Sequence, residues 1–319
     1  MARNGHPAVD AAAQTIRARV LRSIALNRNP GLHFPGYFLD FDWVSIADGN
    51  AKIAIADGPH CRDANGDVDI AVLAVLADTA LGTSARQSLA PGARLATMHM
   101  QLQFTGAPAT GPIISDGHLV GFASRLAVRQ ALSTATLYAN NEIIAHASGQ
   151  FAALDPPPGV NLAPLPWQLV RLPTAGPVDE QALEPDERSV LEACDAALAK
   201  ASPQASFIQH LWDGIPRNNA GEATGRVAIG PHLGNRVGHV QGGITLGIAA
   251  THACAAAPAM MMLSNVSAWY ISPGRGEALQ IRSHLVYAGR TIAVVRTEIK
   301  NSAGDRVLEA VTQHVARSD

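Results

Sequence analysis

The sequence predicts an α+β protein made of two tandem units, each an antiparallel sheet wrapped around one central helix. The first observation is an internal repeat: His118-Leu119-Val120 recurs as His284-Leu285-Val286, an offset of 284 − 118 = 166, and 127–128 recurs as 293–294 at the same offset. Each half also contains one long apolar stretch followed by four segments with strand-like alternation. Because repeated units bury the surfaces that two subunits would bury, we expect the halves to pair as a pseudo-dimer.

The first unit, residues 1–155, begins with a predicted helix over 8–26. Two β-leaning segments, 37–46 and 52–56, flank the turn sequence Ala47-Asp48-Gly49-Asn50 and predict a hairpin. A polar loop leads from this hairpin to the central apolar stretch. Four strands are expected after that stretch, over 96–104, 113–122, 126–139 and 143–154.

The central stretch of the first unit, Asp69 to Arg86, reads DIAVLAVLADTALGTSAR. Its eight consecutive apolar residues, Ile70 to Ala77, leave no polar face at a helical or a strand period, and the length favours a helix buried on every side. Asp78 stands alone in these apolar surroundings. Either its carboxylate caps or pairs with a neighbour elsewhere in the chain, or the small side chains around it leave room for a ligand.

A proline-rich segment, 156–185, predicts a linker without regular structure before the second unit, 186–319. The second unit is expected to repeat the order of the first, with a helix over 187–201 and a central apolar helix over 242–255. The expected β-segments of this unit are 207–212, 226–229, 261–271, 277–287, 291–300 and 307–316.

The composition excludes several classes of function. A formal net charge of −2, a pI near 6.6 and the lack of a basic run predict no nucleic-acid partner. No apolar run approaches the roughly 18 residues of a membrane span, so no membrane partner is expected. Three widely spaced cysteines, Cys61, Cys194 and Cys254, indicate a reducing compartment, and we expect a cytoplasmic protein. We expect no metal or cofactor, because His60 and Cys61 near Asp63 lack further ligands at a suitable spacing.

Residues 234–243 read GNRVGHVQGG, in which Asn235, Gly238, Gln241, Gly242 and Gly243 resemble the N-x-x-G-x-x-H-G-G signature of hotdog-fold acyl-CoA thioesterases of the phenylacetate-pathway type. In that family the two glycines open the central helix. An acidic residue follows nine positions after the motif histidine, within L-A-D-x-A-x-G. The segment LADTALG, residues 76–82, is similar to this second piece. The resemblance implies two tandem hotdog domains paired as a pseudo-dimer.

The two pieces of the motif lie in different halves. Nine positions before Asp78 stands Asp69, followed by Ile70-Ala71 in place of the glycines, so the first half is expected to have lost the turn. Nine positions after Gln241 stands Ala250, so the second half has lost the carboxylate. The family combines the glycine turn of one subunit with the acid of the other. The resemblance therefore implies one complete site, Gln241-Gly242-Gly243 facing Asp78, and one dead site, although independent decay of both halves would leave the same pattern.

The resemblance also implies roles for individual residues. Backbone N–H groups at Gly242 and Gly243 would stabilise the oxyanion of a thioester under attack, and Asp78 would act either as general base or as nucleophile. Further candidates are Asn235 as an orienting polar group, Gln241 in place of the motif histidine, Thr83 and Ser84 one turn past Asp78, and Arg290 with Arg125 for the phosphates of coenzyme A. A hydroxyl bonded to its own helix and a solvated turn arginine are the structural alternatives.

These inferences together predict an acyl-CoA thioesterase that hydrolyses its substrate to a free acid and CoA. Two alternatives stay open at this point. One is a non-catalytic protein that binds or senses acyl-CoA, favoured by glutamine in place of the motif histidine; the other is a hotdog enoyl-CoA hydratase. Acyl-CoA is the expected partner in each case, and a homodimer of double-hotdog chains is a further expectation.

Overall fold

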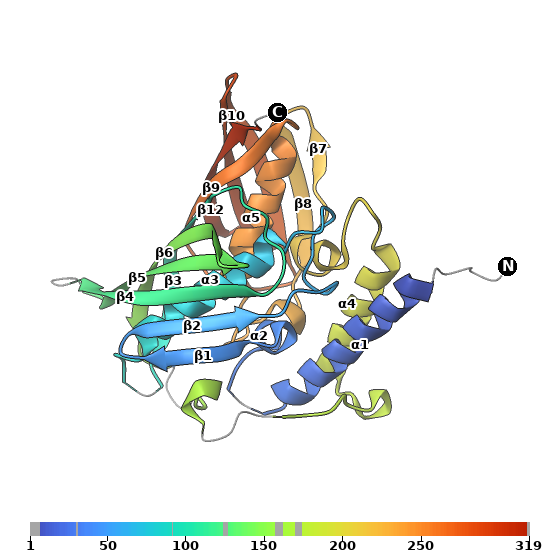
Figure 1. The fold of residues 1–319 in the computed structure, drawn as a ribbon, viewed down its shortest axis with the longest axis vertical. Helices are drawn as coiled ribbons and strands as arrows, with labels where there is room; N and C mark the ends of the chain where they lie inside the picture. The colour runs from blue at the N-terminus through green and yellow to red at the C-terminus, as the bar shows by residue number, and fades with distance from the viewer. Residues whose placement is uncertain are drawn as a thin grey trace.

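One antiparallel sheet of twelve strands continues through both halves of the chain (Figure 1). The computed structural model describes residues 7–29, 31–90, 92–123, 127–156, 162–169 and 174–317. The first half forms α1 (Pro7–Asn27), α2 (Phe34–Leu39), β1 (Asp42–Ala47), β2 (Asn50–Ile55), α3 (Ile70–Arg86), β3 (Arg94–Phe104), β4 (Ile113–Ala123), β5 (Gln130–Ala139) and β6 (Glu142–Leu154). The second half forms α4 (Pro185–Lys200), the π-helical turn η3 (Gln209–Asp213), β7 (Arg217–Asn219), β8 (Glu222–Ala228), α5 (Gly242–Ala256), β9 (Met261–Tyr270), β10 (Ala278–Ala288), β11 (Ile292–Asn301) and β12 (Arg306–Ala316). The two halves therefore repeat one order of elements.

Short 3-10 turns interrupt three irregular stretches, at η1 (Pro166–Gln168), η2 (Glu180–Ala182) and η4 (Pro231–Leu233). The first two lie in the proline-rich segment between β6 and α4. Outside these turns, the described part of that segment has no regular structure. This agrees with the high proline content, because proline supplies no backbone N–H for a helix or a sheet.

The strand order shows how the halves are joined. It runs β1-β2-β4-β5-β6-β3-β9-β12-β11-β10-β8-β7, so the second six strands repeat the first six in reverse. At the junction of β3 and β9, Gln101 lies opposite Ser267, and these two residues differ by the offset of the sequence repeat (267 − 101 = 166). A pseudo-twofold axis therefore passes beside this pair, and the predicted edge-to-edge pairing of two sheets is confirmed.

The helices α3 and α5 are buried against each other inside the curve of the sheet (Figure 1). Residues 71–77 of α3 and 243–250 of α5 are all buried, as the apolar stretches predict. The two backbones approach very closely, because a Cβ added at Gly247 would lie 2.3 Å from the Cα of Ala71, and one added at Gly243 would lie 2.5 Å from the carbonyl of Ala74. Only glycine fits at these two positions.

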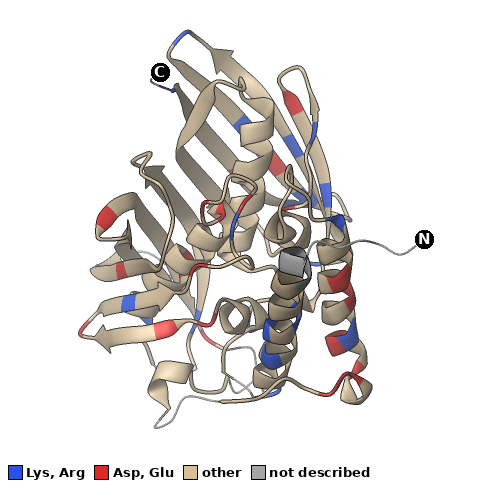
Figure 2. Cartoon of the chain, turned by 45° about the vertical axis from the view of Figure 1, so that its right-hand side comes forward, with Lys and Arg blue, Asp and Glu red and all other residues tan. Residues whose placement is uncertain are grey.

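Helices α1 and α4 pack together outside this core and carry charges of both signs (Figure 2). Arg17 of α1 forms ion pairs with Asp195 of α4 and with Glu180 of η2. Arg28 forms a further ion pair with Glu187 at 2.7 Å. These ion pairs join the surfaces of the two opening helices, whereas their inner faces, with residues such as Ile24 and Leu191, pack into the hydrophobic core.

Two predicted β-segments are wrong, the first in part and the second throughout. In 37–46, Tyr37 and Phe38 belong to α2, which His33 caps by accepting a hydrogen bond from the N–H of Gly36. In 207–212, Phe207 and Ile208 are α-helical and the residues from Gln209 onward form η3, so no residue of this segment is in a strand. Both segments are rich in large side chains that pack into the core, including the fully buried Trp212, so tertiary packing overrides their β propensity.

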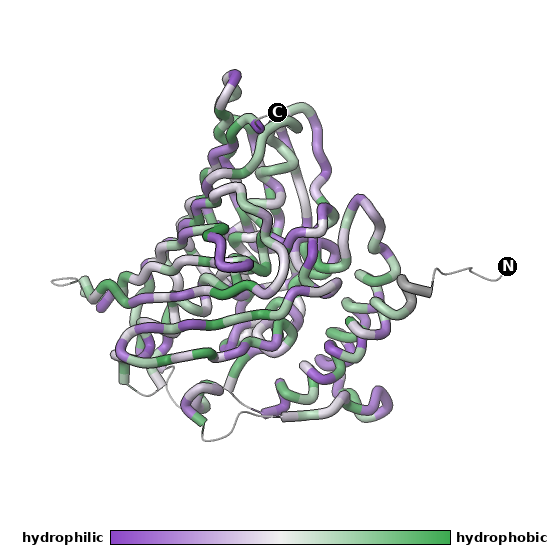
Figure 3. The backbone as a smooth tube through the Cα atoms, in the orientation of Figure 1, coloured by the Kyte–Doolittle hydropathy of each residue, from purple (hydrophilic) through white to green (hydrophobic). Residues whose placement is uncertain are grey.

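The strands follow the alternation expected from the sequence. β5, for example, alternates strictly between buried and half-buried residues, and Figure 3 shows hydrophobic and hydrophilic residues alternating along several strands. In the described residues, no helix is both long enough and apolar enough to span a membrane.

Candidate functional site

The loop before α5 positions the candidate site. Asn235 is at the start of a tight turn, where its Oδ1 accepts hydrogen bonds from the N–H groups of Val237 and His239 at 3.0 and 3.1 Å. Gly238 continues the turn with a φ of +77°, which glycine adopts without strain. The carboxamide oxygen of Asn235 thus stabilises the loop, and no hydrogen bond joins Asn235 to Asp78.

Gln241 ends the loop and caps α5. Its Oε1 accepts a hydrogen bond from the N–H of Ile244 at 2.9 Å, while its Nε2 donates to Asp78 Oδ2 at 2.7 Å. Because the cap uses the oxygen, the amide orientation is fixed and the NH₂ group must face the carboxylate. The structure therefore brings together the two residues that the sequence placed in different halves.

Two other groups contact or face the Asp78 carboxylate. Thr97 of β3 donates its hydroxyl to Oδ1 at 3.1 Å, and the backbone N–H of Gly243 faces it from the N-terminus of α5. Burial raises the pKa of Asp78 to about 6, while hydrogen bonds from Thr97, Gly243 and Gln241 and the positive charge of Arg86 oppose that rise. The carboxylate is therefore a base that ionises just below neutral pH.

A cavity of about 480 Å³ opens beside this cluster. Asp78 and Thr83 line it from α3, Gln241 and Gly242 from the second half, and Trp167 from the segment between the halves. The ring of Trp167 also packs against Trp43 of β1, with centroids 4.7 Å apart. The proline-rich segment thus forms one wall of the cavity.

The two glycines of the motif have different surroundings. A Cβ on Gly242 would approach Thr97 Oγ1 and Asp78 Oδ2 at 3.1 and 3.2 Å, so this glycine keeps the space beside the carboxylate open. Gly243 is required by the close approach of α3 instead. Tyr270 of β9 donates its hydroxyl to the carbonyl of Gly242 at 2.8 Å and so holds the start of the helix in place.

The remaining residues singled out from the sequence are not all at the cavity. Thr83 lines it, but the hydroxyl of Ser84 donates to the carbonyl of Leu81 and contacts Ser133, away from the cavity. Arg290 is exposed in the turn between β10 and β11 and is not among the residues that line the cavity. Arg125 lies outside the described residues.

Sequence reasoning missed Thr97 and Tyr270. Both lie on strands that alternate like the others, and no motif marks them. Their positions depend on the β3–β9 junction, which brings these strands beside the start of α5. The repeat offset pairs Phe104 with Tyr270 (270 − 104 = 166). This pairing alone does not show that the hydroxyl of Tyr270 holds the start of α5.

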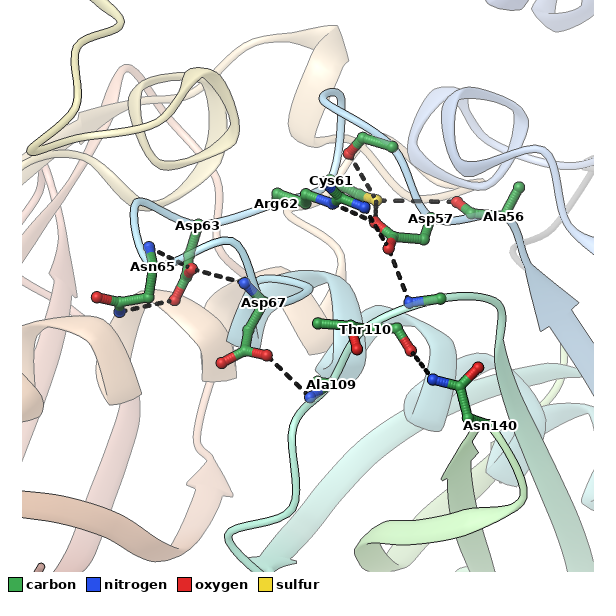
Figure 4. A network of polar contacts seen from close by, with 12 residues as sticks. Ala56, Asp57, Cys61, Arg62, Asp63, Asn65, Asp67, Ala109, Thr110 and Asn140 are labelled. Atoms are coloured by element: carbon green, nitrogen blue, oxygen red, sulfur yellow. Dashed lines mark hydrogen bonds and ion pairs between the residues drawn. The ribbon is translucent and has the colours of Figure 1, made fainter.

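The pseudo-symmetric position at the start of α3 retains the turn that the sequence suggested was lost. Asp63 Oδ1 accepts hydrogen bonds from the N–H groups of Asn65 and Asp67 at 2.8 and 3.2 Å, as Figure 4 shows, and Gly66 has a φ of +92°. Asp69 then caps α3 by accepting from the N–H of Ala71. Only the two glycines are missing, so the expectation of a lost turn is wrong.

A different carboxylate occupies the region opposite Asp69. Asp213 of η3 is fully buried and accepts a hydrogen bond from Thr251 Oγ1 at 2.9 Å. Burial raises the pKa of Asp69 to about 7, and burial followed by the charge of Asp69 raises the pKa of Asp213 well above its usual range. Asp213 of η3 thus occupies this second position, whereas the region beside Asp78 holds a cavity.

His252 is buried in α5 and donates from Nδ1 to the carbonyl of Ile248 at 2.9 Å, so its ring contributes to packing. Within the described parts of the chain, no group of three or more His, Cys, Asp or Glu residues could hold a metal ion.

Solved structures show which fold this arrangement defines. A putative thioesterase from Novosphingobium aromaticivorans is 13% identical over 85% of this chain and 97% of its own, with a TM-score of 0.53. The tesB protein of Mycobacterium avium subspecies paratuberculosis is 11% identical over 88% and 96%, with a TM-score of 0.52. A conserved protein with a hot dog fold from Alicyclobacillus acidocaldarius is 8% identical over 88% and 97%, with a TM-score of 0.51. The chain is therefore a double hotdog, with two hotdog units in one polypeptide.

A family model adds a finding from the sequence of the second half. Residues 232–315 match the model described as the acyl-CoA thioesterase N-terminal domain. The match begins just before Asn235 and spans α5 and nearly all of the following strands. No match to the sequence is found among curated proteins.

Proposed function

We propose that this protein is an acyl-CoA thioesterase that hydrolyses an acyl-CoA thioester to a free acid and CoA at one composite site. The observation that carries the proposal is the hydrogen bond from Gln241 Nε2 to Asp78 at 2.7 Å, which joins the two halves at the N-terminus of α5. The family-model match and the name of one structural relative, a putative thioesterase, support this class of reaction. The motif pieces around Gln241 and Asp78 favour the phenylacetate-pathway type of hotdog thioesterase.

The geometry supports a general-base mechanism. The thioester carbonyl oxygen would lie at the N-terminus of α5, where N–H groups and the helix dipole stabilise negative charge. Asp78 would take a proton from a water molecule as the water oxygen attacks the carbonyl carbon. Breakdown of the tetrahedral intermediate then releases the CoA thiolate, which takes up a proton. Attack by Asp78 itself, through a mixed anhydride, is the alternative route from the same position.

Gln241 takes a role that needs no ionisation. Its oxygen is fixed by the helix cap, so its NH₂ group is a permanent donor toward Asp78 and toward a water molecule beside it. Thr97 donates to the other carboxylate oxygen. These two donors would hold the carboxylate in one orientation with its remaining lone pairs toward the cavity.

The test is thiol release from a panel of acyl-CoA substrates by wild type and by Asp78→Asn. The variant keeps the shape and the hydrogen-bonding capacity of the side chain but removes the base, so turnover should fall by about 100-fold or more. Asp69→Asn is the matched control, because Asp69 is a second buried carboxylate of the first half, at the position that corresponds to Gln241; its turnover should stay within about threefold of wild type, since Asp and Asn both cap a helix well.

The outcomes separate the enzyme from the alternatives. Acyl-CoA binding without thiol release by the wild type would identify a sensor. Equal losses of turnover in the two variants would refute the composite site.

Three further expectations belong to the proposal. We place the domain boundaries at 1–155 and 186–319, with 156–185 between them. The three free cysteines, Cys61, Cys194 and Cys254, are in keeping with a cytoplasmic protein. We also expect two of these double-hotdog chains to form a homodimer.

A further inference from the structure

Three arginines line the cavity, of which Arg94 donates a hydrogen bond to the carbonyl of Asp155 at 3.1 Å and the other two approach each other. Arg86 lies in the last turn of α3 and Arg236 in the loop before α5, and both line the cavity. Each donates a hydrogen bond to a backbone carbonyl, Arg86 to Ala93 at 3.0 Å and Arg236 to Ala163. Within the described residues, neither guanidinium forms an ion pair with a carboxylate. In this part of the chain, neither Arg86 nor Arg236 therefore has a carboxylate at ion-pair distance, although the charge of Asp78, which lines the same cavity, acts on Arg86.

These charges are close enough to affect each other and a neighbouring histidine. Burial lowers the pKa of Arg86 to about 10, and the charge of Arg236 adds to that effect. Burial lowers the pKa of His33 to about 4, with further contributions from both arginines. His33 also lines the cavity, and its Nδ1 accepts from the N–H of Gly36, so the neutral ring carries its proton on Nε2. An anion in this position would meet two guanidinium groups and a neutral N–H donor.

Arg86 and Arg236 are both half-buried, so each guanidinium is partly removed from water with no carboxylate of the described residues in contact. Removing a charge from water is unfavourable unless a partner of opposite charge accepts its hydrogen bonds. Guanidinium groups also present paired donors that match the two oxygens of a carboxylate. An anionic part of the substrate would therefore stabilise this part of the cavity when it binds.

The spacing along α3 indicates which part of the substrate reaches the arginines. Arg86 follows Asp78 by eight residues, a rise of about 12 Å along the helix. Helical side chains lean toward the N-terminus, which shortens the distance from the guanidinium to the reacting carbonyl to roughly 6–10 Å. An acyl chain of five to seven bonds spans about 6–8 Å at about 1.2 Å per bond. The phosphates of CoA are separated from the thioester sulfur by about twice as many bonds.

Part of the wall between Asp78 and Arg86 is apolar, beside the side chains of Thr79 and Thr83. Gly82 lies on α3 between Asp78 and Arg86, and a Cβ placed on it would be 3.9 Å from both Leu95 and Phe151. All three residues line the cavity. The cavity thus has a reacting end, a short, partly apolar middle and a cationic end, an order that matches a chain with a thioester at one end and a carboxylate at the other.

We propose that the substrate is an acyl-CoA whose acyl group ends in a carboxylate, and that Arg86 and Arg236 bind this distal carboxylate. The proposal rests on the thioesterase function proposed above. It names the substrate class, a monothioester of a dicarboxylic acid with CoA, and two residues that determine specificity.

The test compares matched pairs of substrates that differ only at the distal end. Glutaryl-, adipyl- and suberyl-CoA are compared with pentanoyl-, hexanoyl- and octanoyl-CoA, and kcat/KM is measured by thiol release. Wild type should prefer the carboxylate member of at least one pair by about 10-fold or more. Arg86→Gln and Arg236→Gln should each reduce that preference, the ratio of kcat/KM for the two members of a pair, by about 10-fold or more, as expected when one partner of a charge pair is lost. The ratio is compared because loss of Arg86 also raises the pKa of Asp78 and so lowers the rate with both members near neutral pH.

Two further variants show whether a lost preference results from a loss of folding. Arg86→Lys keeps the charge but not the paired donors, so it should restore part of the preference. Arg188→Gln is the matched control: Arg188 also donates one hydrogen bond to a backbone carbonyl, but it is exposed on α4 and does not line the cavity. It should keep the wild-type preference.

N-acetylcysteamine thioesters distinguish the two sources of negative charge, because they contain the acyl group but no phosphate. The preference for the carboxylate should persist with these substrates. If the arginine substitutions slow all CoA substrates equally and leave the N-acetylcysteamine thioesters unaffected, the arginines bind CoA phosphate and the proposal is wrong.

Binding measurements keep the proposal testable if the protein releases no thiol. Calorimetry with adipyl-CoA and hexanoyl-CoA on wild type and Arg86→Gln reports the carboxylate preference directly. Absence of turnover with a retained binding preference would overturn the thioesterase function alone. Equal binding of the two ligands by wild type would overturn the carboxylate site.

Discussion

The carboxylate of Asp78 is held between two opposing influences. Burial raises its pKa, whereas Thr97, Gly243, Arg86 and Gln241 all favour the charged form, and the result is a pKa of about 6. A base with this pKa is mostly ionised at neutral pH and still able to accept a proton from water. A glutamine in the motif position suits this arrangement, because it donates without a titration of its own.

The first prediction at this scale concerns pH. If the ionised form of Asp78 is the active base, kcat/KM should rise with pH through a midpoint near 6 and then level off. Thr97→Val removes a donor to the carboxylate and leaves burial unopposed at that oxygen, so the pKa should rise and the midpoint should move to higher pH. The profile is measured between pH 4.5 and 9 in buffers of constant ionic strength.

Thr79→Val provides the control for this shift. Thr79 lies beside Asp78 on α3, but its hydroxyl donates to the carbonyl of Val75 at 2.7 Å and not to the carboxylate. Its removal should leave the midpoint where it is in wild type. A midpoint that is unchanged in Thr97→Val would mean that the rise of kcat/KM with pH reports the ionisation of a group other than Asp78.

The sequence predicted some of these residues and not others for a physical reason. Asp78 and Gln241 are conspicuous because a lone acid in an apolar helix and a glycine turn are local patterns. Thr97 acquires its role only through the fold of β3, and no local pattern shows it. Arg86 is hidden in a different way, because a basic residue in the last turn of a helix is already explained by the helix dipole.

At the scale of elements, the crossing of α3 and α5 determines the position of the site. Gly243 and Gly247 let the two helix backbones meet, and this contact sets Gln241 at hydrogen-bonding distance from Asp78. The sequence predicted both helices and their burial, since long apolar stretches leave few alternatives. It did not show that the glycines serve helix packing, because a glycine turn before a helix has a sufficient explanation of its own.

A prediction follows for the stability of this crossing. Gly247→Ala places a Cβ 2.3 Å from the backbone of Ala71, so the helices must move apart, and the free energy of unfolding should fall by about 1–3 kcal/mol or more. Gly82→Ala is the matched control on α3. Its Cβ would meet neighbours at 3.9 Å, an ordinary contact, so the higher helix propensity of alanine should leave stability equal or raised by up to about 1 kcal/mol.

Chemical denaturation of the two variants under one set of conditions measures this difference. Equal stabilities would show that the helices can separate without loss, and that their close contact does not hold the site together.

At the scale of the whole molecule, the pseudo-twofold axis relates two positions that have diverged. Both have the same turn before the central helix, made by Asn235 in one case and by Asp63 in the other. A cavity lies beside the position at the start of α5, and η3 occupies the position at the start of α3. The sequence predicted one working and one dead position from the missing glycines and carboxylate. The filling of the second by a π-helical turn could not be predicted, because it depends on where the segment after α4 packs.

The last prediction concerns the separation of the halves. Residues 1–158 alone would expose the edge of β3 and the face of α3 that packs against α5, and both surfaces favour association. Because Gln101 and its repeat-mate Ser267 pair at the axis, two copies can pair β3 with β3 in the same register. Their central helices, however, would meet at Ala71 and Ala74 without the glycines that allow the native approach. We therefore expect a loosely packed dimer or larger aggregates, detected by light scattering after size exclusion, whereas a stable monomer with native helix content would contradict the view that each half depends on the other.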